Sequence, residues 1–284
     1  MKLVLSRKGF DSGTGGHPSP ILPDGRMLSL PIPSSLDVLK YDEIRAMPGK
    51  SVQDILTELD AHPRIEAKGA HLDPDLVEMA RPRKPGWRPA LGQVEAAAGH
   101  LRNQKIGPRD LFLFYGWFRQ TEAIDGRLRF KKGAEDLHII YGYLQVDTVC
   151  PVKDLEGLPE WLLDHPHTLP SRLLLKNNSI FIARPTLSWN HSMSGAGTFR
   201  FSDRLVLTQR GMSRGRWNLD PALFRHLPIT YHSLDSWKAG YFQSYARAQE
   251  YVVDADGPAE MWARSLIDEV AISTSNCIQA QRKI

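Results

Sequence analysis

The sequence predicts an α+β fold. We expect a central mixed, mainly antiparallel sheet that could form a partly open barrel, with helices packed around it and a helical C-terminal part. Two runs rich in aromatic and β-branched residues, 110–120 and 136–146, predict the long strands of this sheet. Apolar residues at helical spacing predict helices elsewhere. No segment marks a clean linker, so we expect a single domain over residues 1–284.

The first half of the chain alternates short strands with helices. The run KLVLS predicts a first strand, and ILPDGRMLSLPIP predicts two extended pieces around an Asp24–Gly25 turn. Helices are predicted for SVQDILTELDAH with Ser51 as N-cap, for DPDLVEMA with Pro74 in its first turn, and for LGQVEAAAGHLRNQ. An N-terminal loop over 6–20, which is rich in glycine and charge, follows the first strand and precedes the other elements.

The second half carries the sheet, over about 110–210, and then the helical part, over about 220–284. The Asp125–Gly126 turn in AIDGRLRF predicts an antiparallel meander of the long strands. Further on we expect a short helix around LPEWLLDHPH and strands at SIFIARP and RLVLTQRG. The stretch from FQSYARAQEYVV through GPAEMWARSLIDEV predicts mainly helix.

Composition excludes several classes of protein. The excess of 36 Lys and Arg over 32 Asp and Glu gives a net charge of +4, which fits a polyanionic partner but is too small to establish one. The two cysteines, Cys150 and Cys277, lie too far apart in the chain for a metal-binding or disulfide pattern. No run approaches the roughly 18 apolar residues that span a bilayer. We therefore expect a cytoplasmic protein without a membrane segment.

Histidines are the first candidates for chemistry, because imidazole is a common metal ligand and acid or base near neutral pH. His138 lies in a predicted strand, His100 lies on a predicted helix, and His165 and His167 form the triplet HPH. No predicted helix carries a His-x-x-x-His or Glu-x-x-His pair, so a metal site would have to combine distant His and Asp residues. Such a mixed ligand set favours iron or manganese over structural zinc. The alternative is that each histidine is simply hydrogen-bonded in a half-buried position.

Two glycine-rich loops, DSGTGG and SGAGTF, could expose backbone N–H groups to a phosphate. The first loop is the better candidate, because Arg7 and Lys8 precede it and Gly15 and Gly16 close it. Neither loop has the P-loop or the dinucleotide-binding pattern, and no GxSxG elbow occurs. Both loops could equally be plain turns.

Strand aromatics and a basic connector are candidates for contact with nucleic acid. The aromatic rings could stack on a base, or they could belong to the core; they are Tyr115, Trp117, Phe118, Tyr141 and Tyr143. The connector RPRKPGWRP, residues 81–89, could contact phosphates or be a solvated loop.

Several long strings in this chain resemble one family. They are LSRKGFDSGTGGHPSPILPDG with LSLPIP, HLRNQKIGPRDLFLFYGWFRQTE, DLHIIYGYLQV, HPH and GAGTF. In this order they resemble the third family of nucleotide modification associated domains, which occurs in bacteria and their phages. The resemblance spans roughly Met1 to Leu219, with one departure at Lys105, where a glycine is expected. It implies a link to modified DNA bases but no particular reaction.

The resemblance favours a functional role for the N-terminal loop and for the histidines in the matched strings. Our leading hypothesis is an enzyme of nucleotide or DNA-base modification. A phosphate and base would be bound by Arg7, Lys8, Gly15, Gly16, Tyr115, Trp117 and Arg119, while Asp11, His100 and His138 would act as acid or base. Asp11, His138, His165 and His167 could instead hold iron or manganese. The alternatives are a non-catalytic reader of modified bases and a metal-dependent oxygenase acting on a non-nucleotide substrate such as a peptide.

Overall fold

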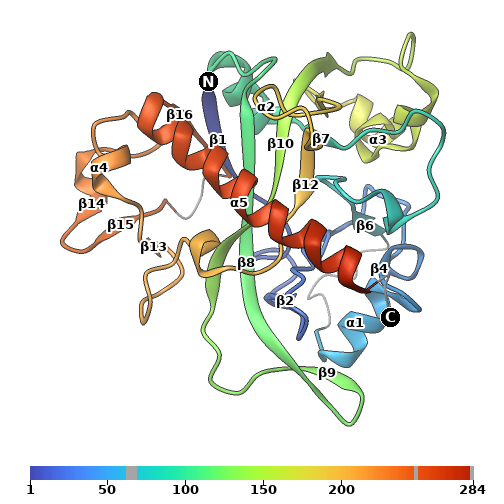
Figure 1. Cartoon of the computed structure of the whole chain (residues 1–284). Helices are drawn as coiled ribbons and strands as arrows, with labels where there is room; N and C mark the ends of the chain where they lie inside the picture. Colours follow the sequence, from blue (N-terminus) through green and yellow to red (C-terminus); the bar gives the residue numbers. More distant parts are fainter. Residues whose placement is uncertain (62–68, 246–248, 282–284) are drawn as a thin grey trace.

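Two long antiparallel strands, β8 (Leu111–Ile124) and β10 (Leu137–Pro151), form the middle of the molecule. Their inner residues are large and fully buried, as the aromatic content of the two runs predicts. The computed structural model describes residues 1–61, 69–245 and 249–281, with side chains up to residue 269. Within these residues the large sheet has the strand order β16–β1–β8–β10–β11–β7 (Figure 1).

The sheet is mixed, because β1 (Lys2–Arg7) and β2 (Ser19–Ile21) pair with β8 in parallel, whereas the other pairs are antiparallel. The predicted α+β class with a mixed, mainly antiparallel sheet is confirmed, and the sheet is not closed into a barrel. The remaining strands of this sheet are β7 (Ala90–Gln93), β9 (Arg127–Phe130), β11 (Ser179–Ala183), β12 (Ala196–Thr198) and β16 (Glu250–Asp254).

A β-bulge interrupts the pairing of β8 with β10. Ile140 pairs with Tyr115 and Gly142 pairs with Phe114, so Tyr141 is an extra residue without a partner on β8. A bulge bends its strand and changes the direction of the side chain that it carries. This feature matters below, because Tyr141 lies on the wall of a cavity.

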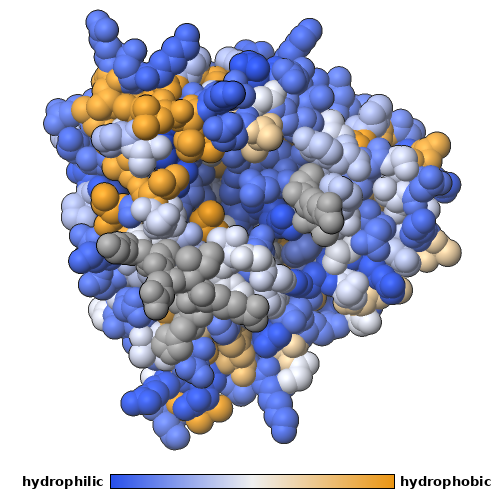
Figure 2. All heavy atoms as spheres, turned by 180° about the vertical axis from the view of Figure 1, so that it is seen from behind, coloured by the Kyte–Doolittle hydropathy of each residue, from blue (hydrophilic) through white to orange (hydrophobic). Residues whose placement is uncertain are grey.

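Helix α5 (Gly257–Gln281) runs diagonally across one face of the sheet (Figure 1). Its residues Ala259, Ala263, Leu266 and Ile267 join the main hydrophobic core, at the spacing of one helical face. From behind, the surface is largely hydrophilic and is hollowed near its middle (Figure 2). No helix in the part of the chain described here is long and apolar enough to cross a membrane.

Two smaller hydrophobic clusters flank the sheet. One gathers around helix α1 (Val52–Glu58), which begins as predicted, because the Ser51 hydroxyl accepts a hydrogen bond from the Asp54 backbone N–H at 3.2 Å. The other gathers around Leu162, Ile180 and Ile182. Between these two clusters lie the segment that follows β6 (Gly69–His71) and the turn η4 (Pro166–Thr168).

The other elements are short. The small sheets contain β3 (Ile32–Ser34) with β6, β4 (Arg45–Met47) with β5 (Lys50–Ser51), and β13 (Arg216–Trp217), β14 (Trp237–Lys238) and β15 (Tyr241–Gln243) together. The other helices and turns are η1 (Tyr41–Glu43), η2 (Glu78–Ala80), α2 (Glu95–Asn103), η3 (Glu160–Asp164), α3 (Pro170–Leu173), η5 (Asp203–Leu205), α4 (Pro221–Phe224) and η6 (Leu234–Ser236).

Several local predictions are wrong. DPDLVEMA forms only the turn η2, because Asp75 instead pairs with Ala90 of β7, and LPEWLLDHPH forms the turns η3 and η4. The first three residues of LGQVEAAAGHLRNQ belong to strand β7, and helix α2 follows after Val94. β9 and β10 both pair with β8, so they do not form a simple meander.

Two predictions for the last third also fail. RLVLTQRG forms η5 and isolated bridges in place of a strand. The stretch FQSYARAQEYVV contributes to β15 and β16, because its apolar residues pair with neighbouring strands, while residues 246–248 lie outside the described part. The C-terminal helix itself is confirmed as α5.

The central strand pair should control stability. Phe114 of β8 is fully buried, so Phe114→Ala should lower the free energy of unfolding by about 3–5 kcal/mol. Ile124→Ala, at the exposed end of the same strand, should change it by much less. Urea unfolding monitored by circular dichroism measures both values; equal losses would contradict the assignment of Phe114 to the core.

Candidate metal centre

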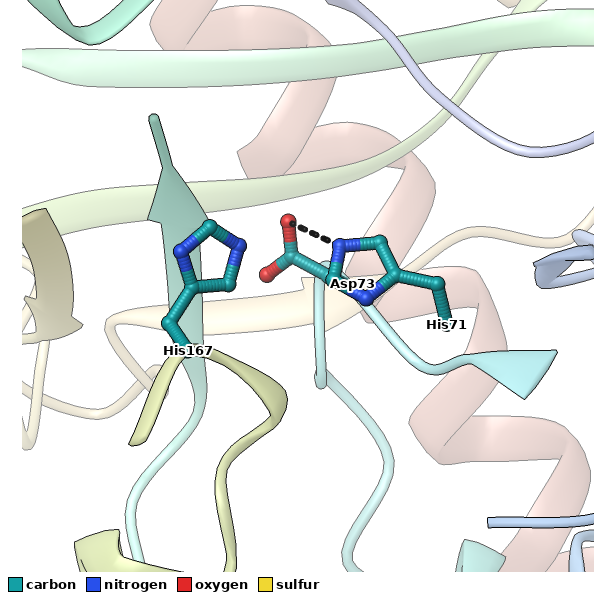
Figure 3. Close-up of side chains that lie close together, drawn as sticks. All are labelled: His71, Asp73 and His167. Carbon is teal, nitrogen blue, oxygen red and sulfur yellow. Dashed lines mark ion pairs between the residues drawn. The ribbon is translucent and has the colours of Figure 1, made fainter. Parts of the chain in front are cut away.

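Two histidines and one aspartate meet between the two smaller hydrophobic clusters. His71 ends β6, Asp73 follows two residues later, and His167 lies in η4. One ligand atom from each side chain lies within 4.8 Å of the other two (Figure 3). Residues i and i+2 of an extended chain share a face, which places His71 and Asp73 on the same side.

The ring of His71 is oriented by Asp37. The Nδ1 atom of His71 lies 3.2 Å from Asp37 Oδ1, and the guanidinium of Arg172 donates to Asp37 Oδ2 at 2.6 Å. Burial would raise the pKa of Asp37, but the contacts with His71, Ser34 and Arg172 outweigh it and lower that pKa to about 2. An ionised carboxylate only accepts hydrogen bonds, so Nδ1 of His71 carries the proton. In a neutral ring the lone pair is then on Nε2, which lies 3.9 Å from Asp73 Oδ2.

The ring of His167 is oriented by Asn178 in the same way. The amide nitrogen of Asn178 donates to the carbonyl oxygens of His167 and Arg172, at 2.8 and 3.3 Å. Its amide oxygen therefore faces His167 Nδ1, at 2.9 Å, and accepts the proton of that atom. Burial lowers the pKa of His167 to about 3, so the ring is neutral at pH 7 and its Nε2 offers a lone pair.

His165 has the opposite tautomer. Its Nδ1 accepts a hydrogen bond from the backbone N–H of His167 at 3.2 Å, so the proton of a neutral ring is on Nε2. That atom is buried and lies 3.5 Å from Asp73 Oδ1, a separation that is long for a hydrogen bond but close for an electrostatic contact. His165 therefore supports Asp73, while His71 and His167 present free lone pairs.

Asp73 is held in place by the backbone. The N–H of Gly92 donates to Asp73 Oδ1 at 2.6 Å. Burial alone would raise the pKa of Asp73, but the contact with His165 and the imidazoles of His167 and His71 lower it. Gly92 also leaves room for His167, since a Cβ at this position would lie 2.1 Å from the imidazole Cδ2 atom.

These residues fit a divalent metal ion. Ligand histidines generally donate their second ring N–H to a carboxylate or carbonyl, as His71 and His167 do here to Asp37 and Asn178. Ligand atoms at about 2.0–2.2 Å from one ion are at most about 4.4 Å apart, so the observed spread of 4.8 Å requires only a small inward movement. Two imidazoles and one carboxylate are the ligand set of non-haem iron sites.

A cavity of about 740 Å³ adjoins this group. Asp73 lines it, and so does Tyr141, the bulged residue of β10. Burial raises the pKa of Tyr141, so its phenol keeps its proton, and the contact with the Ser29 side chain offsets only part of this rise. The wall of the cavity thus includes a residue of the His/Asp group and a tyrosine from the bulge of β10.

The structure brings together only some of the histidines and acids that the sequence indicated. His165 and His167 lie in the group just described. His138 is half-buried elsewhere, and its Nδ1 accepts a hydrogen bond from Trp217 at 3.1 Å. His100 lies on α2, 3.2 Å from the Thr230 hydroxyl.

The N-terminal loop has a defined structure, and its polar residues stabilise it. The carboxylate of Asp11 accepts from the backbone N–H groups of Gly13 and Thr14, at 2.8 and 2.6 Å, and lies 3.9 Å from the Arg7 guanidinium. Lys8 forms a buried ion pair of 3.0 Å with Glu250. Gly15 has φ +89° and packs on the ring of Phe10, and Gly16 has φ +79°.

The predicted substrate-binding strand residues have protein partners. Tyr115 is in the core, against His138, Trp217 and Tyr251, which leaves no ring face for a base. The indole N–H of Trp117 donates to Asp136, and Arg214 covers its ring at 3.8 Å. Arg119 also binds Asp136, at 2.8 and 2.9 Å.

The basic connector is also paired internally. Arg83 forms a bidentate ion pair with Asp75, with both distances 2.6 Å, and stacks on Trp87. Arg88 binds Asp147, and Lys84 lies near Glu160 and Asp164. These contacts favour the structural interpretation of the connector over a phosphate-binding arm.

Sequence reasoning missed His71 and Asp73. The signal was present as His-x-Asp, followed later by the HPH triplet, because two histidines and one carboxylate form a recognised ligand set. Asp37 and Asn178 carried no local signal, since their partners lie 34 and 11 residues away in the chain.

Comparison with known proteins identifies the family. The family model of nucleotide modification associated domain 3 matches residues 2–254, and the chain belongs to this family. This confirms the resemblance in the sequence. No match was found among curated proteins or among solved structures.

The tautomers are directly measurable. In metal-free protein, long-range ¹H–¹⁵N spectra should show His71 and His167 protonated at Nδ1 and His165 protonated at Nε2, because of the partners described above. Substitution of each histidine by glutamine assigns the signals. Protonation of His71 or His167 at Nε2 would contradict the proposed arrangement of lone pairs.

Proposed function

We propose that this member of the third nucleotide modification associated domain family is a metal-dependent enzyme that modifies a nucleotide or a base in DNA. His71, Asp73 and His167 would hold iron or manganese. One observation carries the proposal: the Nε2 atoms of two oriented imidazoles converge with a buried carboxylate at the wall of a cavity. Such a metal keeps open coordination positions for substrate, water or dioxygen.

The protein's own residues would bind and orient the substrate. Asp73 belongs to both the His/Asp group and the cavity wall, so a ligand in the cavity would be adjacent to the metal. The Tyr141 hydroxyl would donate a hydrogen bond to an acceptor atom of the substrate, because its raised pKa keeps it protonated at neutral pH. His165 would keep the Asp73 carboxylate turned toward the two ligand imidazoles.

The alternative of a non-catalytic base reader has less support. It relied on the aromatic residues of β8 and β10, and most of these, including Tyr115, Phe118 and Tyr143, are buried in the core. A reader also has no need for three oriented metal-ligating side chains. An oxygenase acting on a peptide would use the same centre, but the family description favours a nucleotide substrate.

Removal of a proposed ligand should abolish metal binding. His71→Ala and His167→Ala should each weaken binding of Mn²⁺, or of Fe²⁺ without oxygen, by more than about 100-fold. Asn178→Ala removes only the support of His167 and should weaken binding by about 10–100-fold. Isothermal titration calorimetry measures these affinities, with melting temperatures as a check on folding.

His100→Ala provides the matched control, because His100 lies outside the group, on α2. It should bind the metal like the parent. If the His71 and His167 variants also bind like the parent, or if the parent binds neither ion, the proposal is wrong.

A second variant changes the site without removing a ligand. Gly92→Ala should push the His167 ring away, since the new Cβ would overlap it, and metal affinity should fall at least about tenfold. Gly107→Ala is the control, because its nearest neighbouring atom is 4.0 Å from the added Cβ. Equal affinities of the two variants would show that the position of His167 is unimportant for metal binding.

A further inference from the structure

Three arginines lie on the wall of the cavity that adjoins Asp73. They come from different parts of the chain: Arg26 follows the Asp24–Gly25 turn, Arg45 begins β4, and Arg200 follows β12. Arg26 and Arg200 are opposite each other in an isolated β-bridge. The fold thus brings three arginines to the wall of the cavity that Asp73 also lines.

Only part of this positive charge is neutralised. Asp24 forms an ion pair with Arg26 at 2.7 Å, whereas Arg200 donates to the uncharged carbonyl oxygen of Asp24 at 3.1 Å. Asp75, also on the wall, is already paired with Arg83. Among the residues described, neither Arg45 nor Arg200 has a carboxylate within ion-pair distance. Two positive charges are therefore available, which matches a phosphate group of charge about −2.

From this we infer that the cavity binds a phosphorylated nucleoside, with its phosphate on Arg45 and Arg200 and its base turned toward Asp73 and Tyr141. The inference rests on the proposed function and names the substrate class of that site. Arginine suits the phosphate because its planar group donates two parallel hydrogen bonds. The apolar side chains of Met27 and Leu76 on the same wall offer a surface for the base.

The size of the cavity fits a nucleotide and excludes a duplex. A volume of about 740 Å³ is within the usual range for small-ligand sites and is far too small for a duplex. A DNA substrate would therefore enter as a single nucleotide flipped out of its strand. A free nucleotide and a flipped one present the same phosphate and base.

The test compares binding of the four 2′-deoxynucleoside 5′-monophosphates with binding of the corresponding nucleosides. In calorimetric titration of the full chain loaded with Mn²⁺, at least one monophosphate should bind about tenfold or more tightly than its nucleoside. Arg45→Ala combined with Arg200→Ala should remove this preference. The control is Arg127→Ala combined with Arg225→Ala, which removes the same charge at exposed positions off this wall and should retain it.

A single-stranded oligonucleotide, titrated in parallel, distinguishes the source of the nucleotide. Arginine-dependent binding of a free monophosphate supports a free substrate, and arginine-dependent binding of the oligonucleotide alone supports a flipped one. The inference is overturned if neither probe binds, or if the arginine variant binds like the control. Mn²⁺ affinity of the arginine variant separates the two proposals, because it should equal that of the parent even if phosphate binding fails.

Discussion

Asp73 is a carboxylate that folding removes from water, and a buried charge must be compensated by nearby donors and charges. Its compensation comes from the backbone of Gly92 and from three imidazoles that lie on two separate segments of the chain. The same requirement applies to Asp37, which contacts His71 and also Arg172, 135 residues away in the sequence. These two carboxylates tie the segment around β6 to the segment around η4. The candidate centre exists because the charges of both buried carboxylates are compensated by donors from these same two segments.

The sheet provides the frame in which this arrangement is held. β7 supplies Gly92, which is small enough to admit the His167 ring and donates its N–H to Asp73. The bulge in β10 supplies Tyr141 to the cavity wall. Gly92 lacks the Cβ that would overlap the His167 ring, and the bulge interrupts the ladder of β8 with β10 at Tyr141. Irregularities of this kind are concentrated at functional sites.

The sequence was informative where structure is determined locally. The long strands followed from their aromatic and β-branched content, and helix α1 followed from Ser51 and its capping hydrogen bond. Prediction failed for β16, because its pairing with β1 joins residues about 250 positions apart. It singled out His165 and His167, which lie beside Asp73, but grouped them with His138, which instead accepts a hydrogen bond from Trp217. No local pattern could have revealed that Asp37 and Asn178 fix the imidazole tautomers.

The central claim is that one metal ion binds between His71, Asp73 and His167. The most direct test is anomalous diffraction from crystals of the full chain grown with Mn²⁺ and measured at the manganese edge. The account predicts one strong peak about 2.0–2.3 Å from both Nε2 atoms and from an oxygen of Asp73, with Nδ1 of each ring still bonded to Asp37 and Asn178. A peak at His138 or His100 instead, or no ordered peak at saturating metal, would contradict it.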